Sequence, residues 1–208
     1  MNAAFFVTGT DTDVGKTIVA ASLVLAMDAH YWKPVQTGAV ENTDFDFVRK
    51  IAGVQEHRIV PSAHCFRAPL SPHLAAALEN ESIALGDFVL PSVRPLIVEG
   101  AGGVFVPLND DDLMVNLMQQ LNLPAIVVAR SGLGTINQTL LTLGALRAHG
   151  VPICGVVMNG PTNEDNRKAI EHFGKVTVLG MVPVLKNVNE VSLQAVGGVL
   201  LKNIVEVL

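Results

Sequence analysis

The glycine-rich stretch "TGTDTDVGKT" (residues 8–17) constrains the fold most strongly. It follows the apolar run "AAFFV" and precedes the apolar segment "IVAASLVLA", so a strand should lead into it and a helix should begin at about Lys16. The spacing differs from the common G-x-x-x-x-G-K-[ST] loop, because five residues separate Gly9 from Gly15. Its position between strand and helix still predicts a phosphate-binding loop, the P-loop (residues 9–17), in which Lys16 reaches phosphate and the Thr17 hydroxyl contacts Mg²⁺. A tight, capped turn is the alternative.

Short apolar runs alternate with segments of helical period along the rest of the chain. Strands are expected at residues 3–9, 31–35, 95–100, 124–129, 153–159 and 176–183. Helices are expected at residues 16–28, 43–52, 71–78, 113–121, 135–149, 163–173 and 191–205. This alternation predicts an α/β fold of the P-loop NTPase kind, with a doubly wound, mostly parallel sheet flanked by helices on both faces. No repeat or break in composition divides the chain, so one domain spanning residues 1–208 is expected.

Composition narrows the class of partner. Hydrophobic residues make up 50% of the chain, yet no run of about 20 predominantly apolar residues is found, so a membrane partner is not expected. No basic segment precedes the first apolar run, which predicts a cytoplasmic protein without a cleaved signal. The net charge of -5 and the lack of a Lys/Arg run argue against nucleic acid as a partner. Cys65 and Cys154 have no paired spacing and are expected to be reduced packing residues.

Charged residues cluster at the expected carboxyl ends of strands, where ligands bind in open α/β sheets. Lys33 lies in "YWKPV" and should point its cation into the same cleft as Lys16, although a lysine at a strand end is usually just solvated. Glu99 ends the apolar run "PLIVE", in the position of the Walker B acid that holds Mg²⁺ in P-loop enzymes. Asp44 starts an expected helix, where an aspartate is most often a cap. Nucleotide-bound Mg²⁺ commonly takes one or two carboxylates, so these acids are its candidate ligands.

Two further segments have polar residues at helix or strand ends. The helix entrance after "SGLG", near Thr135, offers N–H donors and a dipole that suit a carboxylate, and ordinary capping is an equally good interpretation. Asn159 in "VVMNGP" could bind a purine edge through its donor and acceptor together, or it could simply form a turn.

In their order along the chain, "VTGTDTDVGKT", "YWKPVQTG", "SPHLAA", "VEGAGG", "GLGTIN" and "VVMNG" resemble the dethiobiotin synthetase family, the ATP-dependent ligases of biotin biosynthesis. That family itself has the longer Gly-x5-Gly-Lys-Thr spacing. The resemblance implies that 7,8-diaminopelargonic acid reacts with CO₂ or bicarbonate to form a carbamate. ATP would then phosphorylate the carbamate, and the second amine would close the cyclic urea and release phosphate.

The resemblance also implies roles for residues. Lys33 would be the catalytic cation, Thr37 would contact substrate, and Mg²⁺ would be held by Thr17, Asp44 and Glu99. The implied nucleotide-binding residues are Asp13, Val14, Gly15, Lys16, Thr17, Ile18, Asp44, Glu99, Gly100, Ala101, Gly102, Asn159, Gly160, Pro183, Val184, Leu185 and Glu190. The substrate carboxylate would be bound by Gly134, Thr135 and Asn137 of the neighbouring subunit, which implies a homodimer with shared sites.

The chain also departs from the family pattern, and related classes remain as alternatives. The link from the first helix to "YWKPV" is short, and Val184 stands where the family commonly has an aromatic residue. Partitioning ATPases resemble the chain in fold, but they have a lysine five residues before the P-loop lysine, where Asp11 stands here. Amidotransferase-like ligases carry a glutaminase domain, for which 208 residues leave no room. A binding module without catalysis would leave Lys16, Lys33 and Glu99 without a purpose. Whether Asp13 faces substrate amines or only shapes the loop stays open.

Overall fold

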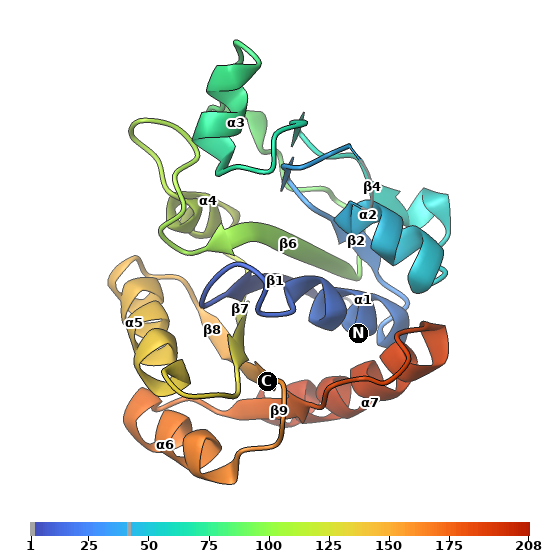
Figure 1. Cartoon of the computed structure of the whole chain (residues 1–208), viewed down its shortest axis with the longest axis vertical. Helices are drawn as coiled ribbons and strands as arrows, with labels where there is room; N and C mark the ends of the chain where they lie inside the picture. The colour runs from blue at the N-terminus through green and yellow to red at the C-terminus, as the bar shows by residue number, and fades with distance from the viewer. Residues whose placement is uncertain (1–2, 41–42) are drawn as a thin grey trace.

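A seven-stranded parallel sheet forms the centre of the computed structural model, which describes residues 3–40 and 43–208. Its strands are β1 (Ala4–Gly9), β2 (His30–Trp32), β4 (Ile59–Val60), β6 (Leu96–Gly103), β7 (Ala125–Arg130), β8 (Ile153–Asn159) and β9 (Val178–Val182). Their order is β4-β2-β6-β1-β7-β8-β9, so β1 lies inside the sheet with β6 on one side and β7 on the other (Figure 1). From β1 the chain goes to β2 and β4 on one side, returns through β6 beside β1, and then continues to β7, β8 and β9 on the other side, which confirms the doubly wound α/β fold.

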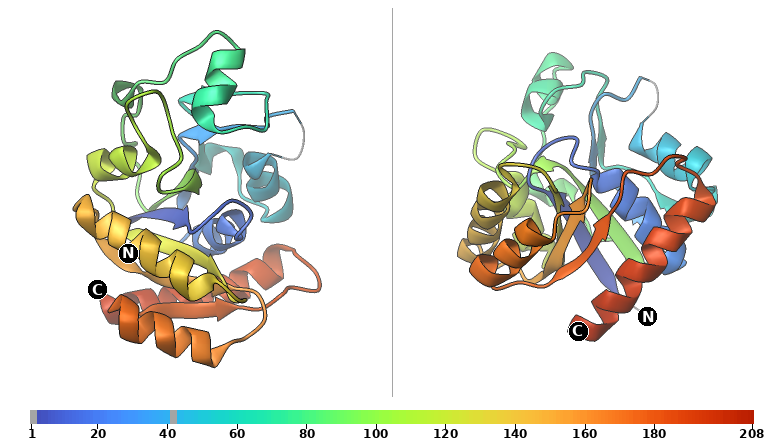
Figure 2. Two further views of the ribbon diagram at one scale, coloured as in Figure 1. Left: turned by 60° about the vertical axis from the view of Figure 1, so that its left-hand side comes forward. Right: turned by 60° about the horizontal axis from the view of Figure 1, so that its bottom comes forward.

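Helices cover both faces of this sheet. They are α1 (Lys16–Ala26), α2 (Asp44–Asp46), α3 (Pro72–Leu78), α4 (Met114–Leu121), α5 (Thr135–Ala148), α6 (Glu164–Gly174) and α7 (Glu190–Val207), with the short η1 (Phe47–Ile51), η2 (Glu56–Arg58) and η3 (Leu85–Asp87). Leu23 of α1 and Leu193 of α7 belong to the core on one face. Leu117 of α4, Leu146 of α5 and Ile170 of α6 belong to the core on the other, and the two sets of helices lie on opposite sides of the sheet (Figure 2).

The two cores explain why the strands are apolar at successive positions. Phe5 and Val7 of β1 pack on the α1 side, whereas Phe6 packs on the opposite side, and none of the three is exposed. A sheet covered on both faces has no polar side to alternate with, so its strands read as continuous apolar runs.

The strand expected over residues 31–35 was wrong as a single element. β2 ends at Trp32, and β3 (Val35–Gln36) pairs instead with β5 (His64–Cys65) in a separate two-stranded sheet. Pro34 lies between β2 and β3 and has no N–H to donate to a ladder, so the pairing of β2 cannot continue past it. The carbonyl oxygen of Pro34 instead accepts the backbone N–H of His64, which directs the chain toward the small sheet.

The helix expected over residues 43–52 was only partly right. Thr43 caps it, because its hydroxyl accepts the Asp46 N–H at 3.0 Å while the Asp46 carboxylate accepts the Thr43 N–H at 3.2 Å. After one turn the chain changes to the wider π-helix η1, in which the Ala52 N–H donates to the Phe47 carbonyl. The short strands β4 and β5 were not expected, since two residues carry no recognisable period.

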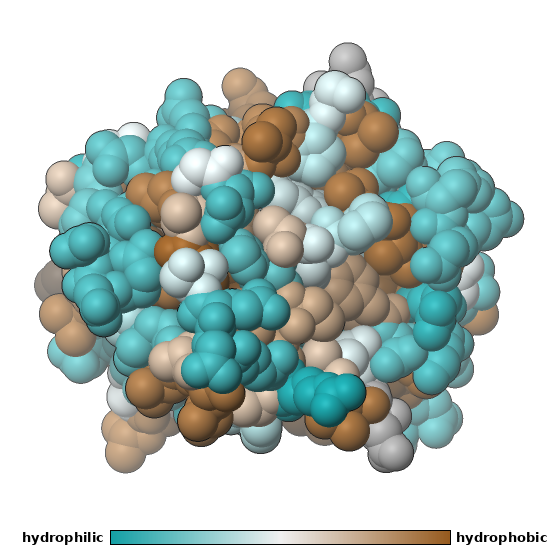
Figure 3. Space-filling model, turned by 90° about the horizontal axis from the view of Figure 1, so that it is seen from above, coloured by the Kyte–Doolittle hydropathy of each residue, from teal (hydrophilic) through white to brown (hydrophobic). Residues whose placement is uncertain are grey.

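The surface mixes polar and apolar groups. On the face that Figure 3 presents, brown apolar residues lie in several separate groups among teal polar ones. Among the helices of the described residues, none combines the length and the apolarity needed to cross a membrane.

Candidate functional site

The P-loop follows β1 at the edge of the sheet where all the parallel strands end. Asp13 and Gly15 adopt left-handed backbone conformations, with φ of +55° and +97°. The Asn159 amide at the end of β8 donates to the Val14 carbonyl at 2.9 Å. A Cβ on Gly15 would lie only 2.0 Å from that amide nitrogen, so only glycine fits where the loop meets β8.

Lys16 is the first residue of α1 and is 7% exposed. Its Nζ donates to the Asp11 carbonyl at 2.9 Å, which curls the lysine back over the loop. Burial lowers the pKa of Lys16, and the nearby Glu99 carboxylate offsets only part of that effect.

Thr17, Asp44 and Glu99 converge from α1, α2 and β6. The Thr17 hydroxyl oxygen lies 2.7 Å from Asp44 Oδ1 and 2.8 Å from Glu99 Oε1. A hydroxyl has one proton and cannot donate to both carboxylates at once. One of these two oxygen contacts therefore lacks a proton, and a bound cation would relieve it. Oxygen ligands of this kind are the ones that Mg²⁺ prefers.

Lys33 contacts the same two carboxylates. Its Nζ is 2.9 Å from Asp44 Oδ2 and 3.1 Å from Glu99 Oε1, and the residue is 4% exposed. Burial alone would lower the pKa of Lys33, but Glu99 and Asp44 outweigh burial and raise it. Burial would likewise raise the pKa of Asp44, but the contacts with Lys33 and Thr17 lower it. Both groups are therefore charged at neutral pH.

The acids alone are too few for a dedicated metal cage. Within residues 3–40 and 43–208, no three His, Cys, Asp or Glu side chains form a group able to hold a metal ion. A metal at this position would be bound by the side chains of Thr17, Asp44 and Glu99, and phosphate oxygens and water would complete its coordination. This is the usual arrangement for nucleotide-bound Mg²⁺.

A cleft of about 890 Å³ opens above these charges. Of the residues predicted for the site, Asp13, Gly15, Lys16, Thr17, Ile18, Lys33, Thr37, Asp44, Glu99, Ala101 and Gly102 line it. Val14 and Gly100 are buried beside it. Charged side chains thus form the floor of a cleft within the usual size range for small-molecule sites.

Sequence reasoning missed the opposite wall of this cleft. Leu70, just before α3, and Pro72 and Leu74, in the first turn of α3, line it together with Val106. The motif "SPHLAA" was interpreted only as part of a helix and of a family pattern. Gln36 was also missed: it lines the cleft and is 4% exposed, and its Oε1 has no hydrogen-bond partner among the described residues. No periodic signal marks either feature.

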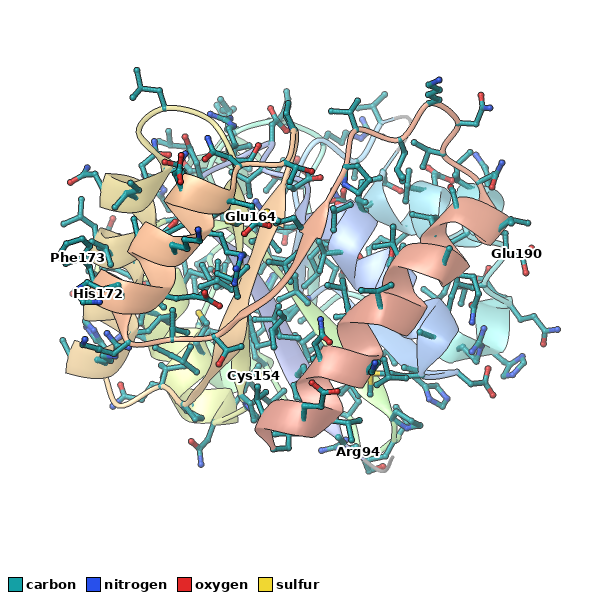
Figure 4. The ribbon with its side chains drawn as sticks, turned by 90° about the horizontal axis from the view of Figure 1, so that it is seen from below. Arg94, Cys154, Glu164, His172, Phe173 and Glu190 are labelled. Atoms are coloured by element: carbon teal, nitrogen blue, oxygen red, sulfur yellow. The ribbon has the colours of Figure 1, made fainter. Side chains whose placement is uncertain are left out.

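The residues predicted to contact the base do not line this cleft. Asn159 and Gly160 lie beside the P-loop, and the Gly160 N–H donates to the Val182 carbonyl at 2.9 Å, which joins the ends of β8 and β9. Pro183, Val184 and Leu185 follow β9, and Val184 is 71% exposed. Glu190 is the first residue of α7, and Cys154 of β8 lies near the opposite end of that helix (Figure 4). Its carboxylate faces the backbone of Gly53.

The predicted carboxylate-binding entrance also lies outside this cleft. Gly134 caps α5 with φ of +91°, and both it and Asn137 are exposed. Thr135 is buried, and its hydroxyl donates to the Arg130 carbonyl. One chain therefore does not bring Gly134, Thr135 and Asn137 together with Lys33.

Tyr31 was not predicted, although it touches the acidic site directly. Its hydroxyl donates to Glu99 Oε2 at 2.9 Å, and the residue is fully buried. Tyr31 is two residues before Lys33, and alternation along an extended chain gives both the same face. That spacing was the available signal.

Comparison with known proteins identifies the family. The family model described as "AAA domain" matches residues 3–192. The ATP-dependent dethiobiotin synthetase of Paramagnetospirillum magneticum is 58% identical over 181 residues, which cover 86% of this chain and 87% of that protein. The enzyme of the same name from Novosphingobium aromaticivorans is 49% identical over 88% of each chain.

Solved structures match the same architecture at much lower identity. The septum site-determining protein MinD of Pyrococcus horikoshii aligns over 100% of this chain and 96% of its own, with a TM-score of 0.57 and 17% identity. A ParA family ATPase of Chlorobium tepidum aligns over 99% and 98%, with a TM-score of 0.53 and 16% identity. At such identity the likeness concerns the fold alone. On the sequence comparisons, the chain belongs to the ATP-dependent dethiobiotin synthetase family.

Proposed function

We propose that this chain is an ATP- and Mg²⁺-dependent dethiobiotin synthetase, a cyclo-ligase that forms C–N bonds in biotin biosynthesis. One observation carries the proposal: the buried Lys33 lies within 2.9 and 3.1 Å of two carboxylates, at the mouth of a P-loop and on the floor of an open cleft. A lysine with a purely structural role is not expected to line a cleft together with a P-loop, as Lys33 does.

The proposed reaction has three steps. One amine of 7,8-diaminopelargonic acid adds to CO₂ and loses a proton, which gives a carbamate. A carbamate oxygen then attacks the γ-phosphorus of ATP, and ADP leaves. The second amine attacks the carbamate carbon and loses a proton, a C–N bond forms, and the C–O bond to phosphate breaks. The products are dethiobiotin, ADP and phosphate.

The chain's own residues suit the negative charge that develops in these steps. Lys33 stays charged because Asp44 and Glu99 raise its pKa, so it can stabilise both the carbamate and the phosphoryl group in transfer. Lys16 and the N-terminal turn of α1 would bind the phosphates. Mg²⁺, held by Thr17, Asp44 and Glu99, would neutralise phosphate charge.

The opposite wall of the cleft suits the rest of the substrate. Leu70, Leu74 and Val106 offer an apolar surface to an aliphatic chain, and Thr37 lies at the side of the cleft with a hydroxyl for a polar group. Asp13 also lines the cleft, and its carboxylate is of opposite charge to a protonated substrate amine. We propose that Asp13 faces the substrate as well as shaping the loop.

The substrate carboxylate would be bound by a second copy of the chain. Gly134, Thr135 and Asn137 form the N-terminal end of α5, which is an attractive site for an anion but does not line the chain's own cleft. Leu133 beside it is fully exposed, as an interface residue would be in the isolated chain. In a homodimer with shared sites, the α5 N-terminus of one subunit would complete the cleft of the other.

The base would lie on the far side of the P-loop, between Asn159 and the segment after β9. The Asn159 side-chain N–H donates to the Val14 carbonyl, and its Oδ1, which accepts no hydrogen bond from the described residues, could accept one from an adenine amino group. Pro183, Val184 and Leu185 would pack against the ring, and Glu190 would close the outer end.

The test is to mix the purified protein with ATP, Mg²⁺, bicarbonate and 7,8-diaminopelargonic acid, and to search for dethiobiotin by mass spectrometry. Dethiobiotin and ADP should appear only when all four components are present. Lys33→Ala should lose turnover and keep most of its nucleotide affinity. ADP that forms only with a protein or DNA partner, without a cyclic urea, would instead support a regulatory ATPase and contradict the proposal.

A further inference from the structure

Tyr31 is a buried polar residue with no role in the reaction described above. β2 pairs with β6 so that Tyr31 is directly opposite Ile97, and these two neighbouring strands are visible near the centre of Figure 1. Side chains two residues apart share one face of a sheet, so Tyr31 and Lys33 lie on the same face as Ile97 and Glu99. This register places Tyr31 beside one oxygen of the Glu99 carboxylate and Lys33 beside the other.

The two carboxylate oxygens of Glu99 have different partners. Oε1 lies 2.8 Å from the Thr17 hydroxyl and 3.1 Å from Lys33 Nζ. Oε2 accepts the Tyr31 hydroxyl at 2.9 Å. Glu99 is 1% exposed, so water has little access to satisfy Oε2 if the phenol hydroxyl is removed. The phenol therefore fixes the plane of the carboxylate and directs Oε1 toward Thr17.

The ring of Tyr31 supports the second carboxylate as well. It meets Phe45 edge to face, with ring centroids 5.6 Å apart and an interplanar angle of 80°. Phe45 follows Asp44 in α2, so this contact holds the element that brings Asp44 to Thr17.

We infer that Tyr31 is a positioning residue for the metal site, which holds Glu99 through its hydroxyl and Asp44 through its ring. The inference rests on the proposed function, in which these carboxylates bind Mg²⁺. Partners that orient metal-ligating side chains typically change metal affinity by about 10- to 100-fold when they are removed. We therefore expect Tyr31→Phe, which removes only the hydroxyl, to lower the affinity for Mg²⁺ about tenfold.

Calorimetric titration of ADP tests this inference without turnover. The titration is made in EDTA and over a series of Mg²⁺ concentrations, for the wild-type protein, Tyr31→Phe and Trp32→Phe. Trp32→Phe is a matched control: Trp32 is the next residue of β2, points to the opposite face, and donates from Nε1 to the Pro61 carbonyl at 3.1 Å. It loses a hydrogen bond and ring volume but touches neither carboxylate.

The expected result is that all three proteins bind ADP equally in EDTA, and that only Tyr31→Phe needs about tenfold more Mg²⁺ to strengthen ADP binding. An unchanged Mg²⁺ dependence in Tyr31→Phe would overturn the inference. Equal loss with and without Mg²⁺ would also overturn it, because a merely structural role affects both. If the wild-type protein makes dethiobiotin while Tyr31→Phe binds Mg²⁺ normally, the inference alone fails. If the wild-type protein shows no Mg²⁺ dependence, the proposed function fails with it.

Discussion

Replacing Lys33 with methionine tests whether the buried ion pair is the structural centre of the site. The substitution keeps most of the side-chain volume but removes the cation that contacts both the Asp44 and the Glu99 carboxylates. Removing one partner of a buried pair typically costs about 3–5 kcal/mol. Because the Asp44 side chain is 31% exposed and can be partly solvated, we expect the lower end of that range, about 3 kcal/mol.

Urea unfolding in metal-free buffer at neutral pH measures this loss of unfolding free energy, and thermal unfolding in the same buffer gives the corresponding change in melting temperature. For a chain of this size about 1 kcal/mol shifts the melting temperature by about 2–4 °C, so Lys33→Met should melt about 6–12 °C below the wild-type protein. Arg49→Met is the matched control: Arg49 also pairs with an aspartate, Asp46 at 3.0 Å, but its side chain is 48% exposed. That surface pair is screened by water, so Arg49→Met should melt close to the wild-type protein.

The pH dependence has a definite sign. The raised pKa of Lys33 contributes stability at every pH below its unfolded value of about 10.4, and this is lost only as the pH rises through the folded pKa. The lowered pKa of Asp44 contributes stability above about pH 3.9, which is lost as the pH falls through the folded pKa. The stability difference between wild type and Lys33→Met should therefore stay level from about pH 5 to 10 and shrink in acid. A loss no larger than that of Arg49→Met, or one independent of pH in acid, would refute this reasoning.

Three further predictions concern backbone space and thiol chemistry. Gly15→Ala should abolish nucleotide binding in a calorimetric titration, because its Cβ would lie 2.0 Å from an amide nitrogen; Gly134→Ala, with a similar positive φ but open space, should still bind nucleotide. Gly197→Ala should lower the free energy of unfolding by about 1–3 kcal/mol, because its Cβ would lie 2.0 Å from a carbonyl oxygen of α1. Gly198→Ala has open space and should raise it by about 0.5–1 kcal/mol, both measured by urea unfolding. Burial raises the pKa of Cys154 to about 11, so this thiol should react with a disulfide reagent at mildly alkaline pH far more slowly than free cysteine does.

Local patterns in the sequence were enough to predict the fold and the floor of the cleft. The apolar runs marked the long strands, and their alternation with helices predicted that all strands would end at one edge. Lys33 and Glu99 each follow or end an apolar run, so their meeting depends only on β2 and β6 being neighbours. The P-loop could be recognised despite its extra residue because strand and helix flank it.

Features that depend on register or long-range packing could not be predicted. The spacing of Tyr31 and Lys33 predicts only that the two share a face; the contact between Tyr31 and Glu99 also requires Tyr31 to lie opposite Ile97, and nothing local specifies that register. The apolar wall of the cleft comes from residues around Leu70 and Leu74, which the small β3–β5 sheet brings over the site. The π-helix η1 also has no pattern of its own in the sequence.

The proposed carboxylation and ring closure are tested most directly with carbon-13-labelled bicarbonate. The protein is incubated with this bicarbonate, ATP, Mg²⁺ and 7,8-diaminopelargonic acid. The product is analysed by mass spectrometry, and the amount of ADP formed is quantified in the same reaction. We predict that the label appears at the urea carbon of dethiobiotin and that one ADP forms for each ring closed. ADP release without a labelled cyclic urea would contradict the proposal that Lys33 and its two carboxylates serve carbamate phosphorylation.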